Sequence, residues 1–198
     1  LRLVKQIMDG RNIDPKKNPP KMAMAIIDRW KDRALSPTDI SPKEAGDAIA
    51  GQMIGIYTEY QARLKSLNAC DFGDLLLHCI AILRSPANAA LLSDYHRRFK
   101  YIMVDEYQDT NRVQYDLVKI LAERHHNLCV VGDTDQNIYS WRGADLRNIL
   151  NFEKDYPQAQ TIFLEENYRS TKNILIAADE VIKKNTARIH KNLITQKG

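Results

Sequence analysis

The 198-residue sequence predicts an α/β fold in which an all-helical region precedes a parallel sheet. Before residue 100, apolar residues recur with the 3.6-residue period of amphipathic helices. After it, three short apolar segments at 100–106, 128–133 and 161–166 alternate with further helical periods. Strands that alternate with helices are typical of parallel sheets with right-handed crossovers. We therefore expect the architecture to change near residue 100.

Two amphipathic helices are predicted in the first 70 residues. Apolar positions recur with helical spacing over residues 23–34 and again over residues 45–64. The second helix has a clear start, because Ser41 can serve as N-cap, Pro42 suits the first helical position, and Glu44 can complete a capping box. We expect one continuous helix from this start.

A third helix is expected to begin after Asp71. Asp71 is a suitable N-cap, and Asp74 falls in the first turn, where a negative charge is favourable. Leu76, Ile80 and Leu83 then follow on one face. This face should pack against the rest of the protein.

The three predicted strands should be buried on both faces, because they are almost continuously apolar. Helical periods over residues 113–121 and 146–152 separate them. Each strand is followed by polar residues. Since ligands of parallel sheets bind beyond the carboxyl ends of the strands, the candidate functional residues lie there.

The composition is that of a globular protein, with 44% hydrophobic residues. No apolar run reaches the roughly 20 residues of a membrane helix, and the first ten residues lack the apolar stretch of a signal peptide. A cytoplasmic protein without membrane contact is expected.

The net charge of +4 is too small to indicate nucleic-acid binding by itself, although residues 168–198 contain seven basic and two acidic residues. The three cysteines form no CxxC pair and are expected to be buried free thiols.

The first strand ends in the acidic pair Asp105 and Glu106. One carboxylate at the end of a rigid strand can hold Mg²⁺, and a second can orient and deprotonate an attacking water. This is the Walker B arrangement. Acidic residues after a strand are also common surface features, so the pair alone does not decide between the two interpretations.

The second strand leads into GDTDQNIYSWRGAD at 132–145. Gln136 could reach a phosphate oxygen. Tyr139 and Trp141 would project from the same side of an extended backbone, with Arg142 beside them, and such an arrangement suits base stacking and phosphate contact. The alternative is that both rings belong to the core, but the surrounding residues are almost all polar.

The third strand leads into LEENYRSTKN at 164–173. Tyr168 and Arg169 precede Ser170, which is a plausible N-cap for a following helix. An arginine at this point could stabilise charge on a transferred phosphoryl group. An arginine near a helix start is otherwise more often a solvated surface residue.

In this order, DEYQDTN, GDTDQNIYSWRGAD and LEENYRS resemble motifs II, III and IV of the UvrD/Rep/PcrA-type superfamily 1 ATP-dependent DNA helicases. DFGDLLL at 71–77 resembles the segment by which the chain of this family re-enters its first motor domain. The resemblance implies a RecA-like, P-loop NTPase-type sheet. It also implies three parts: a helical inserted subdomain at 1–70, the C-terminal part of the first motor domain at 71–155, and the start of the second motor domain at 156–198.

The resemblance assigns five residues to ATP and Mg²⁺. Asp105 would coordinate Mg²⁺, Glu106 would act as the base that activates water, and Gln136 would sense the γ-phosphate. Tyr168 would stack on adenine, and Arg169 would act as an arginine finger from the second motor domain.

The resemblance assigns a second group of residues to DNA. Tyr139 and Trp141 would stack on single-stranded DNA, and Arg142 would lie near it. For the parent protein the resemblance implies 3′ to 5′ translocation, unwinding at single/double-strand junctions, a role in DNA repair or replication, and repair proteins as partners.

One part of the family pattern is missing from the sequence. A GxxxxGK[ST] phosphate-binding loop does not occur, and in the nearest spacing, GDAIAGQM at 46–53, Gln52 and Met53 replace the lysine and the hydroxyl residue. The family's N-terminal glutamine motif and motifs V and VI are also missing. We therefore expect an internal fragment that is inactive in isolation. The alternative is a non-catalytic single-stranded DNA-binding or protein-interaction module derived from a helicase.

Overall fold

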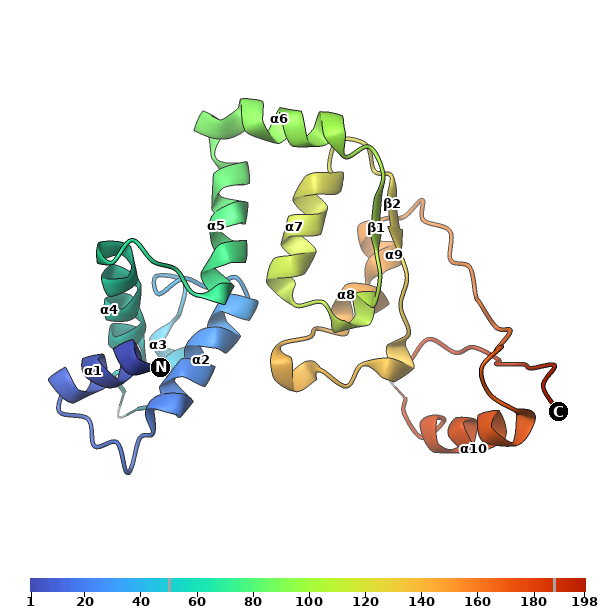
Figure 1. Ribbon diagram of the computed structural model, residues 1–198, viewed down its shortest axis with the longest axis horizontal. Coiled ribbons are helices and arrows are strands. Elements are labelled where there is room, and N and C mark those ends of the chain that lie inside the picture. The colour runs from blue at the N-terminus through green and yellow to red at the C-terminus, as the bar shows by residue number, and fades with distance from the viewer. Residues whose placement is uncertain (50, 187) are drawn as a thin grey trace.

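The computed structural model describes residues 1–49, 51–186 and 188–198, and for Arg142 it describes only the backbone. Figure 1 shows helices α1 to α4 at one end of the molecule, the two strands with α7 in the middle, and α10 at the other end. The helices are α1 (Arg2–Gly10), α2 (Pro20–Asp32), α3 (Pro42–Ala45), α4 (Met53–Ser66), α5 (Phe72–Arg84), α6 (Ala89–Arg98), α7 (Arg112–Ala122), α8 (Arg147–Leu150), α9 (Phe152–Asp155) and α10 (Lys172–Ile182). The strands are β1 (Ile102–Val104) and β2 (Leu128–Val130), and short 3-10 helices are η1 (Pro86–Asn88), η2 (Tyr107–Asp109), η3 (Thr134–Gln136) and η4 (Ser140–Arg142).

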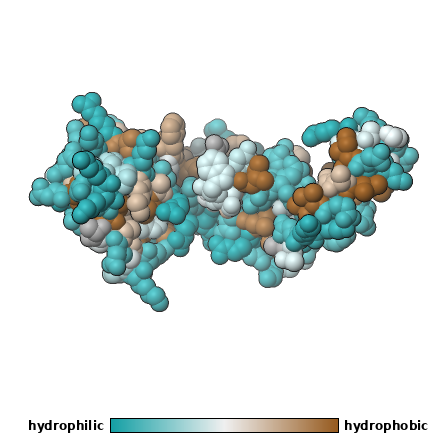
Figure 2. Space-filling view, turned by 90° about the horizontal axis from the view of Figure 1, so that it is seen from below, coloured by the Kyte–Doolittle hydropathy of each residue, from teal (hydrophilic) through white to brown (hydrophobic). Residues whose placement is uncertain are grey.

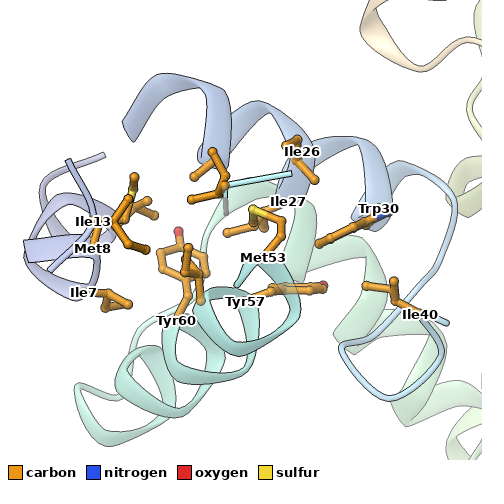
Figure 3. Packing of buried hydrophobic residues seen from close by; sticks show 14 residues of the cluster. Ile7, Met8, Ile13, Ile26, Ile27, Trp30, Ile40, Met53, Tyr57 and Tyr60 are labelled. Atoms are coloured by element: carbon orange, nitrogen blue, oxygen red, sulfur yellow. The ribbon is translucent and has the colours of Figure 1, made fainter. Parts of the chain in front are cut away.

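Helices α1, α2 and α4 enclose the larger hydrophobic core (Figure 3). Helix α2 occupies the predicted position, and Trp30 on its inner face stacks on Tyr57 of α4 with ring centroids 5.9 Å apart. Helix α1 was not predicted, although Val4, Ile7 and Met8 are buried at helical spacing. The helical region therefore has a core of its own.

The prediction of one helix over residues 45–64 is wrong. Ser41 accepts a hydrogen bond from the Glu44 amide as expected, but α3 ends at Ala45 and α4 begins only at Met53. Between the two helices, Gly46 and Gly51 have positive φ, which glycine adopts without steric cost. Turns therefore interrupt the helical period while the apolar residues still face the core.

The sheet is smaller and more exposed than predicted. Strands β1 and β2 are parallel and pair Ile102 with Leu128, as expected for two strands joined by a crossover helix. The predicted third strand at 161–166 is wrong, because its only β-contact among the described residues is a single bridge between Glu166 and Ile194. Burial on both faces is also wrong, since Met103 in the middle of β1 is 76% exposed.

The connecting helices follow the predicted periods with two corrections. Helix α7 has a complete capping box at Asn111, but the period over 146–152 forms two short helices, α8 and α9, separated at Asn151. Thr171, and not Ser170, is the N-cap residue of α10. The Ser170 amide instead donates to Asn167 Oδ1. The cysteines are free as predicted, but all three are exposed.

A second, smaller core joins α5 to α7 through Ile80, Leu83, Val113 and Ile120. Helix α10 buries no residue. Within the described ranges no single helix is long and apolar enough to cross a membrane, and the one combination that passes by length and composition, Phe72–Arg84 with Pro86–Arg98, is bent by 79°.

Candidate nucleotide and nucleic-acid site

The acidic pair lies directly beyond the carboxyl end of β1, as predicted. Asp105 and Glu106 are both exposed, and Asp105 Oδ1 accepts a hydrogen bond of 2.9 Å from the Glu106 amide. Glu106 adopts the left-handed conformation, with φ 50° and ψ 42°. This conformation costs a non-glycine residue roughly 1–3 kcal/mol and is concentrated at functional sites. The chain therefore turns sharply at the residue predicted to act as the base.

Gln108 fixes the Glu106 side chain, and the sequence analysis missed it. Its side chain is fully buried, and Nε2 donates a 2.7 Å hydrogen bond to Glu106 Oε2. Gln108 Oε1 accepts a 2.9 Å hydrogen bond from the amide of Asp133, beyond β2. A Cβ atom at Gly132 would lie 2.7 Å from Gln108 Oε1, so a larger residue there would displace the Gln108 side chain. The only sequence signal for Gln108 is an amide placed two residues after the acidic pair.

Gln136 lies at the end of η3 and is connected to the acidic pair by hydrogen bonds. Its Nε2 donates to Asp133 Oδ2 at 2.9 Å, and Asp133 is bonded to Gln108 through its backbone amide. Burial opposes ionisation of Asp133, but hydrogen bonds from Lys191 and Gln136 outweigh it and lower the pKa of this carboxyl group. A continuous chain of bonds thus runs from Glu106 to Gln136.

An open pocket of about 460 Å³ brings Gln136 together with residues Glu166, Asn167, Tyr168 and Arg169. Its volume is in the range of small-molecule sites. The Tyr168 hydroxyl donates to Glu166 Oε2 at 2.8 Å, and this hydrogen bond, followed by the charge of Glu166, raises the pKa of the phenol. Three of the residues predicted from separate segments therefore share one pocket.

Asp105 and Glu106 do not line this pocket. Glu106 is connected to it through Gln108 and Asp133. Arg169 is exposed, and its amide donates to Asn167 Oδ1 at 3.0 Å, which fixes its backbone.

The aromatic pair is close together on the surface. The ring centroids of Tyr139 and Trp141 are 6.4 Å apart with an interplanar angle of 48°. Trp141 is 69% exposed, so the alternative that the rings belong to the core is wrong. The expected extended backbone is also wrong, because residues 140–142 form η4. The side chain of Arg142 lies outside the described part of the chain.

Gly143 allows this aromatic turn to approach the end of α2 closely. Its φ is 85°, and a Cβ atom there would lie 2.4 Å from Asp32 Oδ2 at the end of α2. Asp32 Oδ1 also accepts a 2.8 Å hydrogen bond from Asn111 Nδ2, after the acidic motif. Burial raises the pKa of Asp32 despite this bond, and Asp28 adds to the rise. Asp32 thus lies against two segments, the aromatic turn at Gly143 and the residue Asn111 that follows the acidic motif.

Comparisons with known proteins identify the family of this chain. Residues 1–157 match the family model described as UvrD/REP helicase N-terminal domain. The chain is 51% identical over 197 residues to the ATP-dependent DNA helicase PcrA of Bacillus subtilis (strain 168), covering 99% of this chain and 26% of that protein. It is 50% identical over 193 residues to the PcrA of Staphylococcus aureus (strain Mu50 / ATCC 700699), covering 98% of this chain and 26% of that protein. The chain spans about a quarter of the length of these relatives. It belongs to the UvrD/REP helicase family.

Proposed function

We propose that this chain is part of an ATP-dependent DNA helicase, in which it couples ATP hydrolysis to 3′ to 5′ movement on single-stranded DNA. The observation that carries the proposal is the position of Gln136. It lines a pocket with Tyr168 and Arg169, and it lies three residues before Tyr139, where the turn that presents the aromatic pair begins. A residue in this position can respond to a nucleotide and shift the aromatic turn. The proposed division is a helical subdomain at 1–70 and motor-domain parts at 71–155 and 156–198.

In this proposal the pocket accepts part of ATP. Tyr168 stacks on adenine, Gln136 hydrogen-bonds the γ-phosphate, and Arg169 stabilises negative charge that develops during transfer. Glu106 accepts a proton from the attacking water, because its carboxylate is held by Gln108 at the end of a rigid strand.

Mg²⁺ bound to such a site neutralises phosphate charge. The described residues contain no group of three or more side chains suited to hold a metal by themselves. Mg²⁺ in ATPases is usually held by one or two carboxylates together with waters and substrate phosphates. The exposed carboxylate of Asp105 fits this donor set, and Asp105 would hold the ion.

The missing phosphate loop favours a second candidate for the isolated chain, a single-stranded DNA-binding or interaction module without ATP turnover. The nearest sequence match, at 46–53, ends in Met53, which is fully buried in the helical core and therefore cannot contact phosphate. We expect purified 1–198 to show negligible ATP hydrolysis. Saturable Mg²⁺-dependent hydrolysis by this chain, lost in Glu106→Gln, would show that it is a complete motor.

Glu106→Gln in the full-length helicase tests the catalytic proposal. Loss of the base should lower turnover by about 10²- to 10⁴-fold while nucleotide affinity changes little, because Glu106 acts on water and not on binding. Steady-state ATPase kinetics and equilibrium nucleotide binding measure the two effects. Glu123→Gln, at an exposed glutamate outside the site, is the matched control. Survival of turnover in Glu106→Gln would rule out this assignment.

Trp141→Ala in the full-length helicase tests the DNA proposal. Loss of one stacked base should weaken single-stranded DNA binding by about 1–3 kcal/mol with little sequence dependence. DNA-stimulated ATPase activity should fall with it, and the melting temperature should not, since Trp141 is exposed. Trp30→Ala, at the buried tryptophan, should lower the melting temperature without a specific loss of DNA affinity in the folded protein. Unchanged DNA affinity in a stable Trp141→Ala protein would contradict the proposal.

The wider assignments remain part of the proposal. They are binding to single/double-strand junctions, contact with DNA repair proteins, a role in repair or replication, and a cytoplasmic location.

A further inference from the structure

Residues 188–195, which we call the strap, bind all three residues that precede Gln136. The Arg188 guanidinium contacts Asp135 Oδ2 at 2.8 Å, and the two side chains are only 8% and 10% exposed. The Lys191 ammonium forms an ion pair with Asp133. Between these pairs, the Ile189 amide donates to Thr134 Oγ1 at 3.1 Å. The strap therefore holds the turn that carries Gln136 from one side.

The other end of the strap binds the segment that carries Tyr168 and Arg169. The Ile194 amide donates to the Glu165 carbonyl at 2.9 Å, and the Ile194 carbonyl accepts from the Asn167 amide at 2.7 Å. Thr195 Oγ1 donates to the Ser170 carbonyl at 3.0 Å. These bonds form the parallel bridge that pairs Glu166 with Ile194. One short segment thus touches both walls of the pocket.

The Arg188–Asp135 pair is poorly explained as a stabilising contact. Burying two charges costs several kcal/mol per ion, which is regained only when the geometry and the remaining hydrogen bonds are good. Here Arg188 Nε and Asp135 Oδ1 are buried and have no hydrogen-bond partner in the part of the chain that the structure describes. A buried pair with unsatisfied atoms adds little to the free energy of unfolding, but it restricts the relative position of the two segments.

We infer that Arg188 is a positioning residue that acts through Asp135 to hold Gln136 opposite Tyr168 and Arg169. Arg188 does not line the pocket. Its effect is geometric, because it fixes the distance between the two pocket walls on which one nucleoside triphosphate would bind. Lys191 supports it through Asp133, whose Oδ2 accepts the hydrogen bond from Gln136. The identity of the ligand rests on the proposed function. The contact between the strap and the two pocket walls does not depend on it.

Two measurements on the full-length helicase test the inference. One reports whether Arg188 holds the strap in place, and the other reports whether this affects ATP hydrolysis. The first is hydrogen exchange without nucleotide: in Arg188→Gln, the amides of Ile189, Ile194 and Asn167 should exchange at least about tenfold faster as the strap opens more often. The second is kcat/KM for ATP in the presence of DNA, which should fall about 10- to 100-fold when the walls lose their alignment. DNA affinity measured without nucleotide should not change.

Three variants sharpen this test. Arg188→Lys keeps the positive charge. It should therefore restore most of the protection from exchange and most of the kcat/KM for ATP. Lys191→Gln, at a less buried position, should give the same changes to a smaller extent and serves if Arg188→Gln does not fold. Lys184→Gln, at an exposed lysine outside the strap, should change neither readout.

The outcomes are distinct. Faster exchange together with lower kcat/KM supports the inference. Faster exchange with unchanged kcat/KM overturns the positioning role, and unchanged exchange overturns the strap itself. A wild-type protein that hydrolyses no ATP refutes the proposed function, and exchange then decides whether the strap exists.

Discussion

The helical region at 1–70 and the C-terminal region at 156–198 both contain apolar residues at helical spacing, yet among the described residues only those of the first region are buried. In the helical region, α1, α2 and α4 enclose a core that includes Ile56 and Trp30. In the C-terminal region α10 forms where its period predicts, but none of its residues is buried. Figure 2 shows the resulting hydrophobic surface at the end of the molecule where α10 lies. Amphipathic spacing thus predicts a helix, whereas burial requires a second apolar surface to pack against.

A buried ionic cluster joins the helical region to the rest of the protein. The Lys31 ammonium on α2 contacts Asp71 Oδ2 at 2.6 Å and Asp74 Oδ1 at 2.7 Å, at the start of α5. Lys31 and Asp74 are almost completely buried, and a Cβ atom at Gly73 would lie 2.9 Å from Lys31 Cδ. The DFGD segment at 71–74 therefore caps α5 and also forms ion pairs with a lysine from another helix.

The largest effect on the helical region is expected from Lys31→Met. Removing one partner leaves buried carboxylates without their cation, which should cost about 3–5 kcal/mol of the free energy of unfolding. Urea denaturation followed by Trp30 fluorescence measures this cost in a Trp141→Phe background, where Trp30 is the remaining tryptophan. Lys65→Met, at an exposed lysine, is the control. Equal stability of the two variants would mean that the cluster does not hold the regions together.

A pair of matched isoleucine substitutions tests the contrast in burial directly. Ile56→Ala creates a cavity in the helical core and should cost about 2–5 kcal/mol. Ile162→Ala, in the C-terminal region at a residue 78% exposed, should change the free energy of unfolding by no more than about 0.5 kcal/mol. Thermal and urea denaturation of both variants measure the difference. Similar losses would show that residues 156–198 are packed in solution, and the comparison would then fail.

A smaller destabilisation than in the helical core is expected at the contact between the helical region and α7. Asn111→Ala removes the N-cap of α7 and the hydrogen bond to Asp32, and should cost about 1–2 kcal/mol. Asp32→Ala removes the second bond and leaves the N-cap intact, and Gln114→Ala removes the reciprocal bond of the capping box. Denaturation midpoints of the three variants apportion the cost. If Asp32→Ala alone reproduced the full loss, the cap would contribute nothing.

Several local elements could be predicted well. The cap at Asp71, helix α7 and the parallel pair of β1 and β2 all follow from residue type and period. The two incorrect predictions relied on the local sequence pattern alone. The single helix over 45–64 and the strand at 161–166 both fit the local pattern, but left-handed turns interrupt the first, and the second has no neighbouring strand among the described residues.

The sequence by itself determined which residues are candidates for the proposed chemistry, because the acidic pair, the glutamine, the aromatic pair and the arginine stand in a fixed order along the chain. Only the tertiary structure decided how they are connected. Gln108 joins Glu106 to the turn after β2, and Arg188 contacts Asp135, which lies 53 positions earlier in the sequence. Such contacts are made between side chains of segments far apart in the sequence, and no local propensity or period encodes them.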